Sequence, residues 1–304
     1  MADIAEIKGR MNSIAETKKV TDAMYMISSV KLRRAKRELE STMPYFDALR
    51  EQITDLFRYI PETENRYFHA SLPEGKEHFR HGILLVTSDK GLAGSYNHTA
   101  IKVAEEYMSR HPETELFIVG EYGWQHFKSR SIPFHEEFRY SAAFPSIGEA
   151  EEICVKLLSL FDTGVVDEIS IIYTDYQGAR PSLCKRNVLL PLDKSTFQTG
   201  REDSADSFKE FFPDVDTVLN GVVPSYLTGF IYSSLVDSYC SEQQARMLAM
   251  STAGNNAEEM LKKLRMEYNS IRQASITNEM IEITSGAAAL RAKHKKIKEE
   301  DANE

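Results

Sequence analysis

Hydrophobic residues near the amino terminus recur at alternating steps of three and four residues. The spacing is set by Ile4, Ile7, Met11 and Ile14. It breaks at a short polar stretch and resumes at Val20. Such steps place one apolar seam along a helix and are typical of a coiled coil. Segment 1–60 is therefore predicted to be a coiled-coil helix, regular over 3–43 and kinked or ended at Pro44.

The carboxyl-terminal part repeats this pattern over a longer stretch. Its seam contains Leu261, Leu264, Tyr268 and Ile271 and then, after a slip, Ile276, Met280, Ile283, Ala287 and Leu290. A coiled-coil helix is predicted over 220–296, and its part from Ser225 to Lys296 would be about 110 Å long. Helices in globular domains are far shorter, so it cannot lie wholly on its own domain. Residues 3–43 and 225–290 are therefore predicted to pair as one antiparallel rod.

The middle of the chain, residues 75–212, holds most of the glycine and proline and has a different pattern. Strands are predicted at 83–86, 116–119, 169–173 and 188–190, and helices at 99–108, 122–129 and 147–161. Continuous apolar runs that alternate with helices favour a mostly parallel sheet. The predicted fold class is thus α/β, of the Rossmann-like kind, plus a long antiparallel α-helical coiled coil formed by the N- and C-terminal helices. Residues 297–304 are expected to be a solvated charged tail.

Composition narrows the functional classes. The chain has 304 residues and a net charge of −9, which argues against a general nucleic-acid binder. No apolar run is long enough to span a bilayer, and the acidic start resembles neither a secretory signal nor a transit peptide. Three cysteines, Cys154, Cys184 and Cys240, lie far apart and indicate buried thiols in a reducing compartment.

The loop after the first predicted strand, Ser88 to Asn97, contains glycines at Gly91 and Gly94. Glycines between a strand and a helix can let backbone amides approach a phosphate. The spacing matches neither a Walker motif nor a complete dinucleotide fingerprint. Two interpretations of the loop therefore remain, a nucleotide or phosphate site and a tight turn or contact loop. The spacing favours the turn.

Other candidate chemistry is sparse. His78 and His81 are close in sequence, but no cysteine or carboxylate cluster completes a ligand set, so a surface pair is expected rather than a metal site. No catalytic triad motif is visible. The sequence therefore predicts no catalytic, metal or cofactor-binding residues.

Five cations fall within seven residues of the first helix. They are Lys31, Arg33, Arg34, Lys36 and Arg37. At 100° per residue they spread around the helix instead of forming one stripe. A DNA-reading helix, a solvated ring of charge and a contact with a surrounding acidic protein partner are the three interpretations.

Three stretches together resemble the gamma subunit of the F-type proton-translocating ATP synthase. They are Ile7–Ala35 (Ile-Lys-Gly-Arg-Met and onward), Thr87–Asn97 (Thr-Ser-Asp-Lys-Gly-Leu-Ala-Gly-Ser-Tyr-Asn), and a third, discontinuous stretch made of Ser241–Met250, Asn255–Ala257 and Tyr268–Leu290. The similarity covers nearly the whole chain.

Three features of the chain depart from the family. Ser28-Ser29-Val30 replaces a step that is usually rich in alanine, and residues 291–304 extend past the usual end. The polar loop 194–209 lacks cysteine, so the thiol switch of chloroplast members is not supported.

The resemblance implies a central rotor shaft that catalyses nothing alone and binds no cofactor. Its coiled coil would sit inside a hexamer of alpha and beta subunits, and its α/β domain would touch the epsilon subunit and the membrane c-ring. Such a shaft couples proton flow to ATP synthesis, or to the reverse hydrolysis, at beta-subunit sites. It would be peripheral, at the cytoplasmic face of the cell membrane.

The resemblance also implies contact residues. Arg272, Gln273 and Thr277 match the family's contact with a beta-subunit loop, and the alternative is a solvated helix face. Further candidates for subunit contacts are Lys90, Arg33 and Arg34. The rival interpretation of the chain is a stand-alone α/β nucleotide- or phosphate-binding enzyme with helical dimerisation arms; a coiled-coil nucleic-acid binder is a third class.

Overall fold

The computed structural model divides the chain into two compact units. One, here called the coil unit, combines Met1–Met24 with Met250–Glu304, and the other, the α/β unit, is Tyr25–Ala249. The residues described are 4–59, 65, 67–68, 79–178, 180–192 and 214–300, with the side chains of 55–59, 215 and 292–300 left out.

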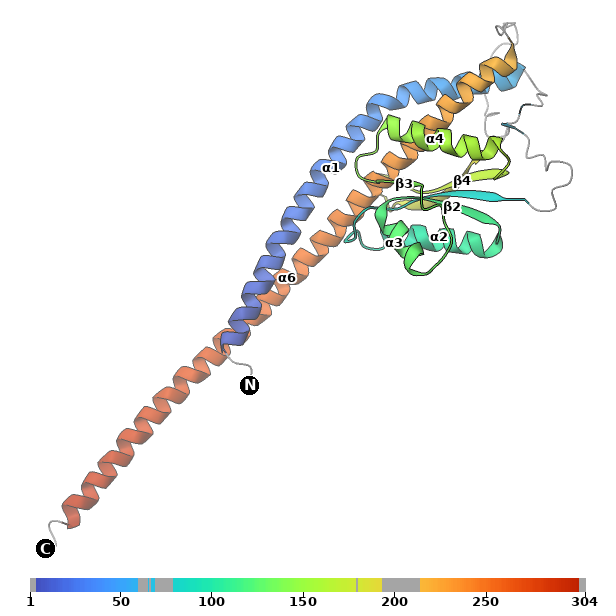
Figure 1. Ribbon diagram of the computed structural model, residues 1–304. Coiled ribbons are helices and arrows are strands. Elements are labelled where there is room, and N and C mark those ends of the chain that lie inside the picture. Colours follow the sequence, from blue (N-terminus) through green and yellow to red (C-terminus); the bar gives the residue numbers. More distant parts are fainter. Residues whose placement is uncertain are drawn as a thin grey trace. The chain divides into compact units, whose positions relative to one another are not determined.

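Two helices dominate the chain and run through both units (Figure 1). Helix α1 spans Ile4–Tyr59 and contains Pro44, and helix α6 spans Val215–Glu300 and contains Pro224. Neither proline ends its helix. Helix α6 also begins earlier than predicted and continues into the charged tail, whose last four residues, 301–304, lie outside the described part.

The two helices are antiparallel within the coil unit, as predicted. Lys18 Nζ lies 2.8 Å from Glu258 Oε2. Further along α1, a methyl group added to Gly254 would meet Asp22 Oδ1 at 3.3 Å. From the first contact to the second, residue numbers rise on α1 from 18 to 22 and fall on α6 from 258 to 254. Gly254 thus leaves room for the Asp22 and Thr21 side chains of α1.

The predicted seam does not stay covered to Leu290. In the register set by Lys18 and Glu258, Ile4 comes opposite the region of Arg272, so α1 is too short to reach further. Seam residues beyond that point are exposed by 48% at Ile276, 58% at Met280, 71% at Ile283 and 68% at Leu290. The prediction that 225–290 pairs throughout with 3–43 is therefore wrong for its last part.

The α/β unit is built on one five-stranded sheet. Its strands are β1 (His81–Val86), β2 (Thr114–Val119), β3 (Arg139–Tyr140), β4 (Glu168–Asp175) and β5 (Leu183–Leu190). The order is β3-β2-β1-β4-β5, and β5 alone is antiparallel to its neighbour. Four predicted strands are confirmed in position, whereas the short β3 was not predicted.

Helices cover both faces of this sheet (Figure 1). Helices α2 (Tyr96–Arg110) and α3 (Glu121–Ser129) pack with Ile83 and Leu85 on one face. On the other face, Leu84 and Val86 join a larger core with α4 (Ile147–Asp162) and the part of α6 from Leu219 to Cys240. Alternate residues of β1 therefore serve two cores, which explains its continuous apolar run.

The two long helices also pair within the α/β unit. Phe46 of α1 packs on Tyr232 of α6, with ring centroids 6.0 Å apart. A methyl group added to Gly229 would come within 2.0 Å of the Phe46 ring. The absence of a side chain at Gly229 therefore makes room for this ring.

Candidate functional site: the junction of the glycine-rich loop with helix α6

The three residues after β1 cap the amino terminus of α3. The bonds run from Glu121 N–H to Asp89 Oδ1 (3.1 Å), from Tyr122 N–H to the Ser88 carbonyl (3.0 Å) and from Gly123 N–H to Thr87 Oγ1 (3.1 Å). A helix leaves its first N–H groups without partners in its own backbone. Here the Thr-Ser-Asp sequence supplies acceptors for three of them in succession.

Two glycines make this close approach possible. A methyl group added to Gly120 would lie 2.4 Å from the Thr87 carbonyl oxygen, and the residue has φ +97°. One added to Gly123 would lie 2.7 Å from Thr87 Oγ1. Neither position has room for a side chain, so β1 and α3 can be joined this tightly only with glycine at both.

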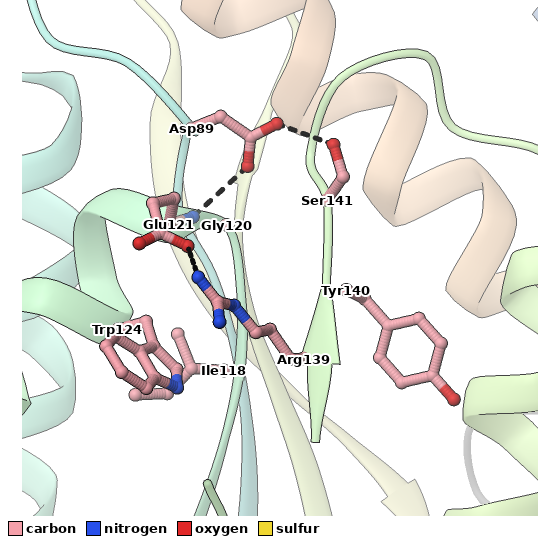
Figure 2. Close-up of a pocket in the computed structure, with 8 residues that line it drawn as sticks. All are labelled: Asp89, Ile118, Gly120, Glu121, Trp124, Arg139, Tyr140 and Ser141. Carbon is pink, nitrogen blue, oxygen red and sulfur yellow. Dashed lines mark hydrogen bonds and ion pairs between the residues drawn. The ribbon is translucent and has the colours of Figure 1, made fainter. Parts of the chain in front are cut away.

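Asp89 binds a second segment as well. Its carboxylate accepts hydrogen bonds from the N–H groups of Glu121, Ala142 and Ala143 and from the Ser141 hydroxyl, the last at 2.6 Å (Figure 2). Burial tends to raise the pKa of Asp89, but these four bonds outweigh burial and hold its pKa below the usual range. Asp89 is therefore an ionised anchor of the loop that follows β3.

Helix α6 holds the next part of the loop. Arg246 donates hydrogen bonds to the carbonyl oxygens of Lys90 (3.1 Å) and Gly91 (3.0 Å) and forms an ion pair with Glu242, one turn earlier on α6. The side chains of Arg246 and Glu242 are only 10% and 8% exposed. Burial raises the pKa of Glu242, and the Arg246 charge opposes this. The pair ties the glycine-rich loop to the helix.

The same face of α6 also meets the end of β4. Thr174 donates its N–H to Ser238 Oγ (3.1 Å) and accepts at its carbonyl from Ser241 Oγ (3.2 Å). Gln244 donates to the Gly178 carbonyl at 2.7 Å. Helix α6 thus covers the carboxyl ends of β1 and β4, the edge at which open α/β sheets bind ligands.

These contacts bear on the two interpretations of the loop. The helix that directly follows the loop is α2, where the Tyr96 N–H donates to the Ala93 carbonyl (3.2 Å) and Asn97 Oδ1 accepts from the Ser88 N–H (2.9 Å). The carbonyls of Lys90 and Gly91 face Arg246, and Leu92 (φ 65°) and Gly94 (φ 57°) complete a tight turn. The geometry supports the turn and contact loop, because the loop is bonded within itself and to Arg246.

A hollow of about 420 Å³ lies beside the junction, between α3 and β3 (Figure 2). Arg139 crosses it, paired with Glu121 at 2.9 Å and with its guanidinium 4.8 Å from the centre of the Trp124 ring. Over the residues the structure describes, no group of histidines, cysteines and carboxylates could hold a metal ion. Within the same residues, no helix is both long and apolar enough to cross a bilayer.

The six predicted contact residues are divided between the two units. Arg272, Gln273 and Thr277 lie in the coil unit with exposed side chains, and Thr277 Oγ1 donates to the Gln273 carbonyl at 2.8 Å. In the α/β unit, the Lys90 side chain is exposed although its carbonyl is held by Arg246.

Arg33 and Arg34 are exposed on α1, and Arg34 pairs with Glu38 at 3.0 Å. Two neighbouring cations of the same cluster lie against aromatic rings: Lys31 Nζ is 5.3 Å from the centre of Phe144, and Lys36 Nζ is 5.1 Å from that of Tyr176. The cluster is thus only partly solvated.

Histidine and junction residues depart from the sequence expectations. His78 lies outside the described residues, and His81 is half-buried against Glu168 instead of being a surface residue. The pair Glu242–Arg246 was not predicted as part of a site. Its i,i+4 spacing was the available signal, but spacing alone does not show that a pair is buried.

Comparison with known proteins finds a family and relatives that match this chain. The ATP synthase family matches residues 3–290. The ATP synthase gamma chain of Acetivibrio thermocellus is 40% identical over 96% of this chain and 100% of the relative. That of Ruminiclostridium cellulolyticum is 37% identical over 95% of this chain and 99% of the relative.

Two solved structures share the fold. One is a chain of the Euglena gracilis mitochondrial ATP synthase, with a TM-score of 0.62 and 16% identity over 95% of both chains. The other, from the Tetrahymena thermophila mitochondrial ATP synthase central stalk and c-ring, has a TM-score of 0.57 and 22% identity over 77% of this chain and 99% of its own. With a family match over nearly the full length and relatives well above 30% identity, the chain belongs to the ATP synthase gamma chain family.

Proposed function

We propose that this chain is the central rotor shaft of an F-type ATP synthase. It couples proton flow through a membrane ring to ATP synthesis, or to the reverse hydrolysis, at beta-subunit sites. The shaft is non-catalytic by itself. It works as a peripheral subunit at the cytoplasmic face of the cell membrane, with alpha, beta and epsilon subunits and the c-ring as its partners.

The uncovered end of α6 carries this proposal. Within the coil unit, Ile276, Met280, Ile283 and Leu290 are each about half exposed or more. These seam residues form one exposed apolar stripe, and such a stripe needs a partner to cover it, because water would otherwise cover that surface. A hexameric ring of alpha and beta subunits around the helix would supply this cover.

The junction described above supplies the other requirement of a shaft. Torque applied to the α/β domain must reach α6 without slippage. Arg246 and Glu242 fix the helix to the glycine-rich loop, and Ser238 and Ser241 fix it to β4. Several polar bonds at defined positions resist sliding better than apolar packing alone, since they are directional.

The rival enzyme interpretation has less support. An α/β enzyme needs an open site at the carboxyl ends of its strands. At that edge α6 is bonded to the end of β4 and to the glycine-rich loop that follows β1. Nucleotide binding by the isolated chain would favour the enzyme, and its absence the shaft.

Co-purification tests the proposal directly. Tagged chain expressed with the other subunits should bring down alpha and beta in a stable complex. The double variant Ile276→Asp with Ile283→Asp should lose them, because it places charge in the covered apolar contact. The matched control, Asn278→Asp with Ser285→Asp, adds the same charge at polar positions of the same helix and should retain assembly. Recovery of the tagged chain alone would contradict the proposal.

A further inference from the structure

A polar cluster at the amino end of the sheet has no part in the junction. The Glu168 carboxylate of β4 is its centre. Four groups converge on Glu168 Oε1: His81 Nδ1 (3.4 Å), Tyr107 OH (3.3 Å), Ser170 Oγ (3.0 Å) and Arg186 NH1 (3.1 Å). The cluster therefore joins β1, α2, β4 and the edge strand β5 through one carboxylate.

A second histidine completes the cluster. His111, directly after α2, stacks on Tyr107 and lies against His81, with ring centroids 4.4 Å apart in both pairs. The Arg186 guanidinium lies 4.7 Å from the centre of the Tyr107 ring. Two imidazoles and a guanidinium thus share one half-buried space with a single carboxylate.

The charge balance of this space changes with pH. With both histidines neutral, the groups that face His111 are Arg186 and Arg110, both cationic, and the anionic Glu168. Glu168 is already bonded to Arg186 and Ser170 and lies beside His81. A proton on His111 therefore has no carboxylate to itself.

We propose that this cluster is an acid-sensitive pin, in which protonation of His111 frees the end of α2 and the edge strand β5 from the sheet. A His111 imidazolium is repelled by Arg186 and Arg110 and competes with Arg186 for Glu168. Arg186 is the group through which β5 reaches Glu168 and Ser170, the latter at 2.7 Å. The release is local and does not depend on the rotor function proposed above.

The direction of the effect follows from linkage. Burial lowers the pKa of His111, and His81, Arg186 and Arg110 lower it further. Glu168 raises it but does not reverse the shift. The packed form therefore binds fewer protons than the opened form. Its stability rises with pH up to the ordinary histidine pKa of about 6.5 and is lost as the pH falls below it.

Hydrogen exchange of the intact chain, followed by mass spectrometry at pH 7.5 and pH 5.5, tests the pin. After correction for intrinsic rates, peptides from 103–112 and 183–190 should lose protection at the lower pH by up to about tenfold, the factor that one pH unit below the ordinary histidine pKa represents. Peptides from 250–270 in the coil unit should keep theirs. Equal loss in all peptides would mean global acid unfolding and would overturn the proposal.

Two variants and a control separate the pin from a structural role. His111→Gln should keep its protection at pH 7.5 and lose most of the acid response. Arg110→Gln keeps the ring but removes one cation that lowers the His111 pKa, so its loss of protection between pH 7.5 and pH 5.5 should be smaller than that of the wild type. The control His98→Gln changes an exposed histidine of α2 and should respond like the wild type. An unchanged acid response in both His111→Gln and Arg110→Gln would show that the cluster is not the sensor.

Discussion

Arg246 donates a hydrogen bond to the carbonyl of Gly91 at 3.0 Å, although 155 residues separate them along the chain. Because Arg246 is also paired with the buried Glu242, one guanidinium satisfies a carboxylate and two loop carbonyls. Removing it would leave a charge and two carbonyls without partners in a space that water scarcely reaches.

Arg246→Ala should therefore lower the free energy of unfolding of the chain by about 3 kcal/mol. Urea unfolding followed by circular dichroism measures the loss. Arg265→Ala, at an exposed position of the same helix, is the matched control and should change stability little. Equal stability of the two variants would show that the junction contributes no more than surface charge does.

Gly120→Ala tests the contact between β1 and α3. The added methyl group would meet the Thr87 carbonyl oxygen at 2.4 Å, and the backbone φ of +97° disfavours any side chain. A loss of at least about 3 kcal/mol is expected. Gly148→Ala, in α4 with nothing within 4 Å of the new methyl, should instead gain up to about 1 kcal/mol. Thermal unfolding of both variants makes the comparison.

Asp89→Asn tests the four-bond anchor through its pH dependence. The depressed pKa means that the ionised group stabilises the fold above its ordinary pKa and that this stabilisation is lost as the pH falls through the folded value. The variant should be less stable than the wild type by about 2 kcal/mol at pH 7, with a smaller difference below about pH 4. Asp47→Asn, exposed on α1, is the control. A difference independent of pH would contradict an ionised anchor.

The three thiols should react slowly in the folded chain. Burial raises the pKa of Cys154 and of Cys184 to about 11 and that of Cys240 to about 12. The thiolate is the reactive form, so each unit of increase lowers the reactive fraction about tenfold. Titration with a chromogenic disulfide at pH 8 should be slow before and fast after unfolding in urea. Rapid reaction of one thiol in the native chain would identify an accessible site.

Hydrophobic periodicity predicted the secondary structure of the long segments and which of their residues are buried. Ile7 in the seam and Leu84 and Leu85 in β1 are buried as their patterns indicate. The pattern could not tell that Ile283 is left uncovered, because an apolar seam looks the same whether its partner is this chain or another. Strand β3 has two residues, Arg139 and Tyr140, too few to show any period.

The site was harder to predict than the fold. Nothing in the spacing of Glu242 and Arg246 distinguishes a buried pair from a surface one, since burial depends on Lys90 and Gly91, far away in the sequence. His81 was expected at the surface because its neighbours in sequence are polar. Its environment is set instead by Glu168 and Tyr107, which only the folded sheet brings to it.

Arg272 and Gln273 give the sharpest test of the proposed rotor. Both side chains are exposed in the coil unit, near the point where α1 no longer covers α6, so they are free to meet another subunit. A charged and a neutral hydrogen bond to a beta-subunit loop would contribute roughly 0.5–3 kcal/mol each, enough to favour one rotor angle without locking it. Arg272→Ala with Gln273→Ala should then slow ATP synthesis and hydrolysis in the assembled complex by about tenfold, which corresponds to 1.4 kcal/mol in the barrier.

The stability of the isolated double variant should stay close to that of the wild type, because it loses no buried contact. Lys262→Ala with Lys263→Ala, also exposed on α6, is the matched control and should leave turnover nearly unchanged. Turnover of purified, assembled complexes, measured beside thermal unfolding of the free chains, separates a contact from a folding defect. Wild-type turnover in an assembled Arg272→Ala, Gln273→Ala complex would show that this face of the helix is simply solvated.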